Sequence, residues 1–176
     1  MKVIDWPKTR CVFEREDQDG RYLVTPTVLD GMEWVFEDGV RAVDKVDGSN
    51  HCVVIEEGRV TAIDNRSTRI IDSPAIMAME NKRALWALKG ALNAIERGWL
   101  KTDGRHYGEL LGPRINGNRH GVDDYLFVPF DILLDRCHWN SWVQNRYPKN
   151  FEALSEWFRE LPSLFSKKYT TNNARS

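Results

Sequence analysis

The feature that most limits the fold of this chain is a pair of short strand-like runs, residues 50–55 and 59–64, joined by the segment EEG. A glycine-containing connection of this length between two such runs is typical of an antiparallel hairpin. The run Val40 to Val46 also reads as a strand, and the turn-forming residues DGSN follow it. We therefore predict an antiparallel sheet that starts near residue 40.

A helix is expected next. Ser73 is suited to cap it, Pro74 fits its first turn, and Gly98 lies where a C-terminal cap would fall. Apolar residues recur at helical spacing and are predicted to form its buried stripe: Leu85, Leu88, Leu92 and Ile95.

In the rest of the chain, predicted strands and a predicted helix are again separated by loops. Residues 105–111 read as a strand, the Gly/Asn-rich loop GPRINGNRHG follows, and the apolar run 125–134 reads as another strand. A short amphipathic helix is expected over residues 151–161, and the polar tail 166–176 is expected to be loose. The predicted class is α+β, with antiparallel sheets and flanking helices in one domain over residues 1–165.

Composition narrows the class of protein. The chain has 176 residues, of which 41% are hydrophobic and 29% charged, and this excludes a disordered or fibrous protein. The net charge of -1 gives no global positive field, so contact with nucleic acid needs a local patch or another domain. The three cysteines have no zinc-site spacing, and no apolar run resembles a signal peptide or a membrane span. These features predict a soluble, cytoplasmic protein.

The segment VDKVDGSN is the most informative for chemistry. It places the Lys45 amine and the Asp47 carboxylate beside the turn at Gly48, at the edge of the predicted sheet. A lysine becomes a nucleophile when neighbouring cations or burial lower its pKa. The alternative is a hairpin turn that merely contains charged residues.

Three further segments hold candidate residues. Glu109 lies in YGELLG, Arg66 in DNRSTRI, and Phe130 in FVPFDI. An arginine can bind phosphate through paired hydrogen bonds, although an exposed arginine is also common on any surface. A solvated charge at a strand end and simple core packing are the corresponding alternatives for Glu109 and Phe130.

Taken in order, these segments resemble the motifs of the covalent nucleotidyltransferases, the superfamily of RNA ligases, DNA ligases and mRNA capping enzymes. KVDGSN at 45–50 is similar to motif I and the arginine of NRST to that of motif Ia. YGELLG at 107–112 is similar to motif III and FVPFDI at 127–132 to motif IIIa. The resemblance covers residues 33–134 and is closer to RNA ligases than to DNA ligases or capping enzymes. It implies an ATP-grasp-like ligase adenylation domain.

The resemblance also implies roles for these residues and for ATP and Mg²⁺. Lys45 would form a lysyl-AMP and release pyrophosphate, and Mg²⁺ would shield the triphosphate; no metal ligand is assigned. The other implied nucleotide contacts are Asp44 on the adenine edge, Asp47 and Gly48 in the pocket, Arg66 on phosphate, Glu109 on the ribose and Phe130 stacked on adenine. The implied partner is nucleic acid, RNA before DNA.

Two motifs of that superfamily are missing from the sequence, a Glu-Gly strand and a Lys-x-Lys strand. Glu57-Gly58 reads as a hairpin turn, and Lys167-Lys168 are adjacent rather than alternating. The sequence therefore leaves open a truncated, split or degenerate ligase, which a second chain could complete, and a DNA ligase-like relative.

The remaining features are open or structural. Arg114, Arg119 and His120 are as consistent with a phosphate-binding loop as with a solvated one. The four histidines show no pairing at metal-ligand spacing, and the cluster of Trp139 and Trp142 favours packing.

Overall fold

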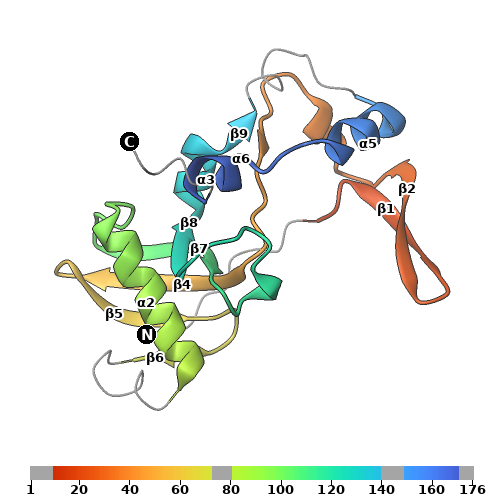
Figure 1. The fold of residues 1–176 in the computed structure, drawn as a ribbon. Coiled ribbons are helices and arrows are strands. Elements are labelled where there is room, and N and C mark those ends of the chain that lie inside the picture. The colour runs from red at the N-terminus through yellow and green to blue at the C-terminus, as the bar shows by residue number, and fades with distance from the viewer. Residues whose placement is uncertain (1–9, 73–80, 140–148, 171–176) are drawn as a thin grey trace. The chain divides into compact units, whose positions relative to one another are not determined.

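The computed structural model describes residues 10–72, 81–139 and 149–170 (Figure 1). These residues form two compact units. Unit 1 holds those between Asp44 and Cys137 and those from Ser163 on, and unit 2 holds those up to Val43 and those between His138 and Pro162. The predicted α+β class with antiparallel sheets is confirmed. Among the described residues, no helix has the length and hydrophobicity needed to cross a membrane.

Unit 1 is built on a five-stranded sheet with the order β6-β5-β4-β7-β8, in which each neighbouring pair is antiparallel. Its strands are β4 (Ser49–Glu56), β5 (Arg59–Asp64), β6 (Arg69–Ile71), β7 (Gly104–Leu111) and β8 (Leu126–Pro129). Its helical segments are α2 (Lys82–Glu96), the 3-10 turn η2 (Asn116–Asn118), α3 (Phe130–Arg136) and α6 (Leu164–Tyr169). The predicted hairpin of residues 50–55 and 59–64 and the strand at 105–111 are confirmed.

Helix α2 begins and ends at residues that are suited to cap a helix. The Asn81 side chain accepts hydrogen bonds from the backbone amides of Arg83 and Ala84, which caps the N-terminus. Gly98 has a φ of +67°, as expected of a glycine just past a helix C-terminus. The predicted capping residues Ser73 and Pro74 lie outside the described residues.

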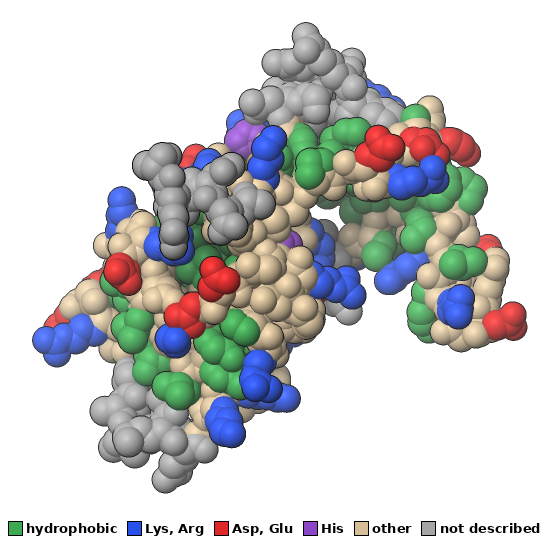
Figure 2. Space-filling view, in the orientation of Figure 1, with side chains coloured by type: hydrophobic (Ala, Val, Ile, Leu, Met, Phe, Trp, Pro, Cys, Tyr) green, Lys and Arg blue, Asp and Glu red, His purple; other side chains and the backbone are tan. Residues whose placement is uncertain are grey.

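The predicted buried stripe of α2 is wrong. Leu85 and Leu92 are 49% and 52% exposed, and Figure 2 shows hydrophobic surface over this helix. Leu88 and Ile95 are only half-buried. The sheet is instead covered by small residues, namely Ala84, Ala87, Gly90, Ala91 and Ala94. The helix lies so close to the sheet that a Cβ on Gly90 would stand 2.5 Å from Leu110 Cδ1 and 3.1 Å from the Phe127 amide nitrogen. Leucines have no room on this face.

Two predicted strands are shorter than expected. The run Val40 to Val46 is a strand only at β3 (Ala42–Val43), which pairs with β9 (His138–Trp139) and not with β4. The run 125–134 is a strand only to Pro129, because proline has no amide hydrogen to continue the ladder, and α3 then begins at Phe130. Residues 166–169, expected to be a loose tail, belong to α6, which Ser163 caps through the Ser166 amide.

Unit 2 packs an aromatic core around one helix. A hairpin of β1 (Phe13–Gln18) and β2 (Arg21–Val28), the 3-10 turn η1 (Glu33–Phe36), the β3–β9 pair and α5 (Phe151–Arg159) make up its described elements. Leu154 of α5 is buried against Phe13, Phe36 and Trp157. The Trp139 ring lies 5.9 Å from that of Trp157, which confirms packing for Trp139, whereas Trp142 lies outside the described residues.

A buried carboxylate ties three strands of unit 1 together. Asp64 of β5 is fully buried, and its two oxygens meet Arg69 Nε of β6 at 2.9 Å and Arg105 Nη1 of β7 at 3.2 Å. A buried carboxylate is tolerated because both of its oxygens are paired with cations. These ion pairs hold the end of β5 in place, directly before the chain turns at Asn65.

The Asp64 cluster generates the first prediction. Asp64→Ala should lower the free energy of unfolding by about 3–5 kcal/mol, because two arginines lose their buried partner. Asp72→Ala is the matched control, since the Asp72 side chain is 68% exposed and its ion pair with Arg69 should contribute at most about 1 kcal/mol. Urea unfolding of both variants checks this, and equal losses would contradict it.

Candidate functional site

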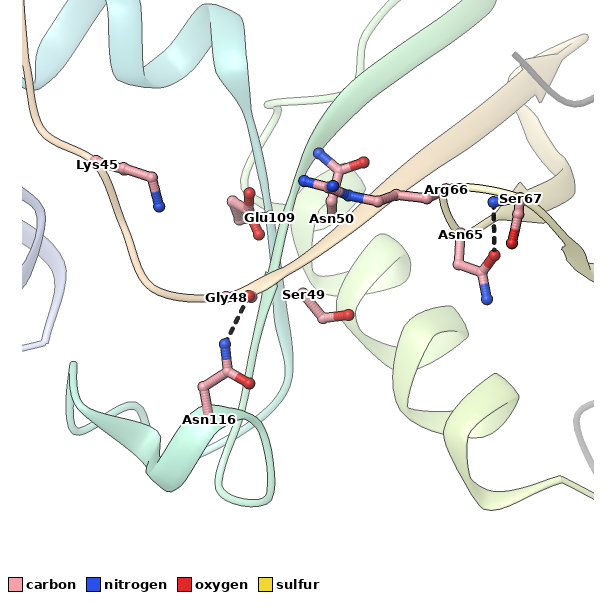
Figure 3. A pocket seen from close by; sticks show the side chains of 9 residues that line it. All are labelled: Lys45, Gly48, Ser49, Asn50, Asn65, Arg66, Ser67, Glu109 and Asn116. Atoms are coloured by element: carbon pink, nitrogen blue, oxygen red, sulfur yellow. Dashed lines mark hydrogen bonds between the residues drawn. The ribbon is translucent and has the colours of Figure 1, made fainter. Parts of the chain in front are cut away.

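The unit 1 sheet is hollowed by a pocket of about 450 Å³ at the end where β4 begins and β5 ends (Figure 3). Residues from widely separated segments line it: Lys45, Gly48, Ser49, Asn50, Asn65, Arg66, Ser67, Glu109 and Asn116. Four of the predicted site residues, Lys45, Gly48, Arg66 and Glu109, are thus brought together. Asp44, Asp47 and Phe130 are not among the lining residues.

Lys45 lies in an extended segment, residues 44–47, that leads into β4. Its side chain is exposed, and Figure 3 shows the amine pointing into the pocket toward Glu109. Gly48 follows where the chain passes closest to β7. A Cβ there would lie 2.8 Å from the Leu110 carbonyl oxygen and 2.9 Å from Glu109 Cβ. Only glycine lets the segment that carries Lys45 approach β7 this closely.

Glu109 supplies the pocket with a partly buried carboxylate. It pairs in register with Asn50 across the β4–β7 ladder. Burial raises the pKa of the Glu109 carboxyl, against the opposing effect of the nearby charges of Lys45 and Arg66. Its Oε2 is buried and accepts no hydrogen bond within the described part of the chain. A buried acceptor of this kind is suited to a ligand that donates a hydrogen bond, such as a hydroxyl.

Arg66 stands at the corner of a tight turn after β5. Asn65 Oδ1 accepts hydrogen bonds from the amides of Ser67 and Thr68 at 3.1 and 2.8 Å, which holds the turn closed. The Arg66 guanidinium reaches back toward Glu109 from the side opposite Lys45 (Figure 3). The pocket therefore has a cation on each side of one carboxylate, an arrangement suited to a ligand that carries phosphate and hydroxyl groups.

The loop after β7 holds the Lys45 segment in place. Asn116 Nδ2 donates to Asp47 Oδ1 at 2.9 Å and to the Gly48 carbonyl oxygen at 2.8 Å. Arg119 Nε lies 3.2 Å from Asp47 Oδ2, and the Asp47 amide donates to His120 Nε2 at 2.9 Å. Asp47 therefore anchors the segment instead of lining the pocket. Arg119 and His120 thus have a structural role, which neither of the two alternatives drawn from the sequence, a phosphate-binding loop or a solvated one, included.

Asp44 makes a second anchor, on the other side of Lys45. It is 8% exposed, and its Oδ2 accepts hydrogen bonds from Ser163 Oγ at 2.8 Å and from the Phe165 amide at 2.9 Å. The carboxylate thus binds the start of α6. The predicted contact of Asp44 with adenine stays a prediction.

Phe130 lies at the first residue of α3, directly after β8, and is partly exposed. Its predicted stacking on adenine also stays a prediction. The amides Asn50, Asn65 and Asn116 line the pocket although the sequence did not single them out. Their signal was positional, since Asn50 belongs to the KVDGSN segment and Asn65 precedes Arg66.

The pocket fits part of what a nucleotide requires. Its two cations suit phosphates, and Glu109 Oε2 suits a ribose hydroxyl. A magnesium ion fits less well, because the described residues contain no group of three or more carboxylate, histidine or cysteine side chains that could hold a metal. Magnesium would then be held mainly by the nucleotide's own phosphates, which is its usual preference.

No protein-family model matches the sequence, and no curated protein matches it. A mutant of Naegleria gruberi RNA ligase solved with ATP and Mn is 22% identical, with 51% of this chain and 24% of that chain covered and a TM-score of 0.35. A second mutant of Naegleria gruberi RNA ligase, in the apo state, is 18% identical over 68% of this chain and 32% of that chain, with a TM-score of 0.35. The chain therefore spans less than a third of the length of these ligases, and the similarity assigns no family.

The raised pKa of Glu109 generates a prediction about stability. The folded state holds this proton more tightly than the unfolded chain, so native stability should fall as pH rises from the ordinary carboxyl pKa, about 4.3, through the raised one. Glu109→Gln does not titrate and should unfold with a higher free energy than the native chain at neutral pH. The difference should vanish below about pH 4.

Urea unfolding across this pH range measures the Glu109 effect. Glu56→Gln, at the exposed end of β4, is the matched control and should show no such divergence. A Glu109→Gln variant that is less stable than the native chain at neutral pH would contradict the prediction.

The hydrogen bonds that Asn116 donates to the Lys45 segment lead to a further prediction, about hydrogen exchange. Asn116→Ala removes both hydrogen bonds to the Lys45 segment, so amide hydrogen exchange over residues 44–48 should become about tenfold faster or more. Global stability should change by only about 1 kcal/mol, since Asn116 is exposed. Asn118→Ala is the control, because Asn118 bonds Val122 within its own loop. Equal exchange in the two variants would count against the anchoring role.

Proposed function

We propose that this chain is the nucleotide-binding part of an ATP-dependent RNA ligase, with Lys45 as the residue that takes AMP covalently. The observation that carries the proposal is that Lys45, Arg66 and Glu109, far apart in sequence, line one pocket. The sequence resemblance assigned these same residues to three different motifs. Their convergence supports that assignment by a criterion independent of the resemblance.

The chemistry proposed for Lys45 is nucleophilic catalysis. Its unprotonated Nζ attacks the α-phosphorus of ATP. The N–P bond forms as the bond from this phosphorus to the bridging oxygen breaks, pyrophosphate leaves with that electron pair, and the amine proton passes to solvent. The AMP is then transferred to the 5′-phosphate of an RNA strand, and a 3′-hydroxyl attacks that phosphate, joins the strands and releases AMP.

The neighbouring residues bind and orient. The Arg66 guanidinium would bind phosphate oxygens, and the free Glu109 oxygen would accept from a ribose hydroxyl. Gly48 and Asp47 would keep the lysine in position, the first by its lack of a side chain and the second through Asn116. Magnesium bound to the phosphates would neutralise charge.

A second candidate function is a module that binds nucleotide without catalysis, or that needs a second chain to complete its site. Among the described residues that line the pocket, Lys45 and Arg66 are the only cations, so few groups balance the charge of a triphosphate. A DNA ligase-like activity is the third candidate. Competition between RNA and DNA ends for the adenylylated protein would separate it from the first.

The test is covalent labelling. The purified chain, incubated with ATP labelled at the α-phosphate and with magnesium, should acquire acid-labile label at Lys45, and Lys45→Ala should acquire none. Lys101→Ala, an exposed lysine outside the pocket, is the control and should be labelled like the native chain.

Each result has a distinct meaning. Label that persists in Lys45→Ala would overturn the mechanism. A native chain that folds and binds ATP but takes no label would favour the module that binds without catalysis or awaits a second chain.

A further inference from the structure

A second pocket, of about 520 Å³, adjoins the Lys45 pocket. The two pockets share Ser49, Asn65 and Asn116 and therefore meet at the end of the sheet. Side chains alternate along a strand, so Glu109 of the first pocket points to one face of the sheet, and His51 and Leu110 of the second point to the other face, which α2 covers. The remaining residues that line the second pocket are His51, Ile70, Arg83, Trp86, Leu110, Arg114 and Ile115. No role in the proposed adenylylation draws on these residues.

The lining combines two kinds of surface. Arg83 at the start of α2 and Arg114 in the loop after β7 are exposed cations from separate parts of the sequence. Neither of them is paired with a carboxylate among the ion pairs within the described residues. Ile70 and Ile115, which are partly exposed, add apolar surface to the lining. Guanidinium groups beside apolar surface suit a ligand that carries both a phosphate and a flat base.

The Trp86 side chain is fixed by packing in a position where such a base could stack on it. Its ring stacks on that of Tyr125, with centroids 5.2 Å apart and planes 9° from parallel. Tyr125 in turn packs on the backbone at Gly112, where a Cβ would collide with the tyrosine ring. The indole is therefore backed on one side by a fixed partner. A rigid aromatic ring binds a base at a smaller cost in conformational entropy than a mobile one.

We propose that this second pocket binds the terminal nucleotide of a 5′-phosphorylated nucleic-acid strand. Arg83 and Arg114 bind its phosphate groups, and its base rests on Trp86. The proposal rests on the proposed function for its purpose, since the residues that the two pockets share bring a strand end to the end of the sheet from which Lys45 would transfer AMP. Its test is independent of that function, because binding is measured without ATP.

The experiment titrates the full chain into a short, fluorescently labelled 5′-phosphorylated oligoribonucleotide and follows anisotropy at several salt concentrations. The variant Arg83→Ala/Arg114→Ala should bind at least about tenfold more weakly, and its dependence of log affinity on log salt should be shallower by about one to two units. Trp86→Ala should also lose about tenfold, from the lost stacking.

Matched controls separate a site from a general charge effect. Arg59→Ala removes an exposed arginine from the far end of β5, and Trp34→Ala removes a tryptophan that is 49% exposed in unit 2. Both should bind within about twofold of the native chain. The native chain should bind the same strand with a 5′-hydroxyl more weakly than the 5′-phosphorylated strand. The double arginine variant should bind these two strands with equal affinity.

Four outcomes would overturn the proposal: no binding by the native chain, equal losses in Arg59→Ala and the double variant, equal affinity for both strand ends, or full displacement of the strand by AMP. The last would mark the pocket as a mononucleotide site. The double variant should still take label at Lys45. Strand binding without any labelling would leave this inference standing while the proposed function failed.

Discussion

The antiparallel pairing of β4 with β7 is the constraint on which the site depends. It sets Asn50 opposite Glu109 and Ser49 opposite Leu110, at the point where the Lys45 segment enters the sheet. Because side chains alternate along a strand, a shift of one residue in this register would turn Glu109 away from the pocket. Gly48 makes this register possible where β4 begins, because any side chain at residue 48 would collide with β7.

Between β3 and β4, the Lys45 segment is held from both sides by side chains, in addition to the Asp44 amide, which donates to the Cys137 carbonyl oxygen at 2.8 Å. Asp44 binds the start of α6, and Asp47 binds Asn116, Arg119 and the imidazole of His120. His120 extends this support, because its Nδ1 lies 2.8 Å from Ser166 Oγ of α6. The two acidic residues that flank the lysine thus serve to hold its backbone. A segment that is not in a strand but is anchored at both ends can present a lysine without burying it.

Several elements could be predicted because their signals are local. The hairpin of β4 and β5, the strand β7 and the helix α5 follow from runs of suitable residues bounded by turn formers. The β1–β2 hairpin has such a signal in Asp19-Gly20, both with positive φ, but the residues on either side of this turn are mixed in polarity and weaken it. The predicted buried stripe on α2 is wrong for a different reason. Periodicity marks an apolar face, yet here the closeness of the sheet selects alanine and glycine for the buried face.

For the site, the sequence by itself determined which residue types are present and in what order: a lysine before a tight Asp-Gly turn, an arginine after a strand, and a glutamate within one. Only the tertiary structure decided that Lys45, Arg66 and Glu109 share a pocket while Asp44 and Asp47 act as anchors. The physical reason is that a motif fixes local chemistry, whereas sheet register and close packing fix which side chains meet. The same packing brings Arg83, Trp86 and Arg114 to one pocket, because no local sequence pattern joins the start of α2 to the loop after β7.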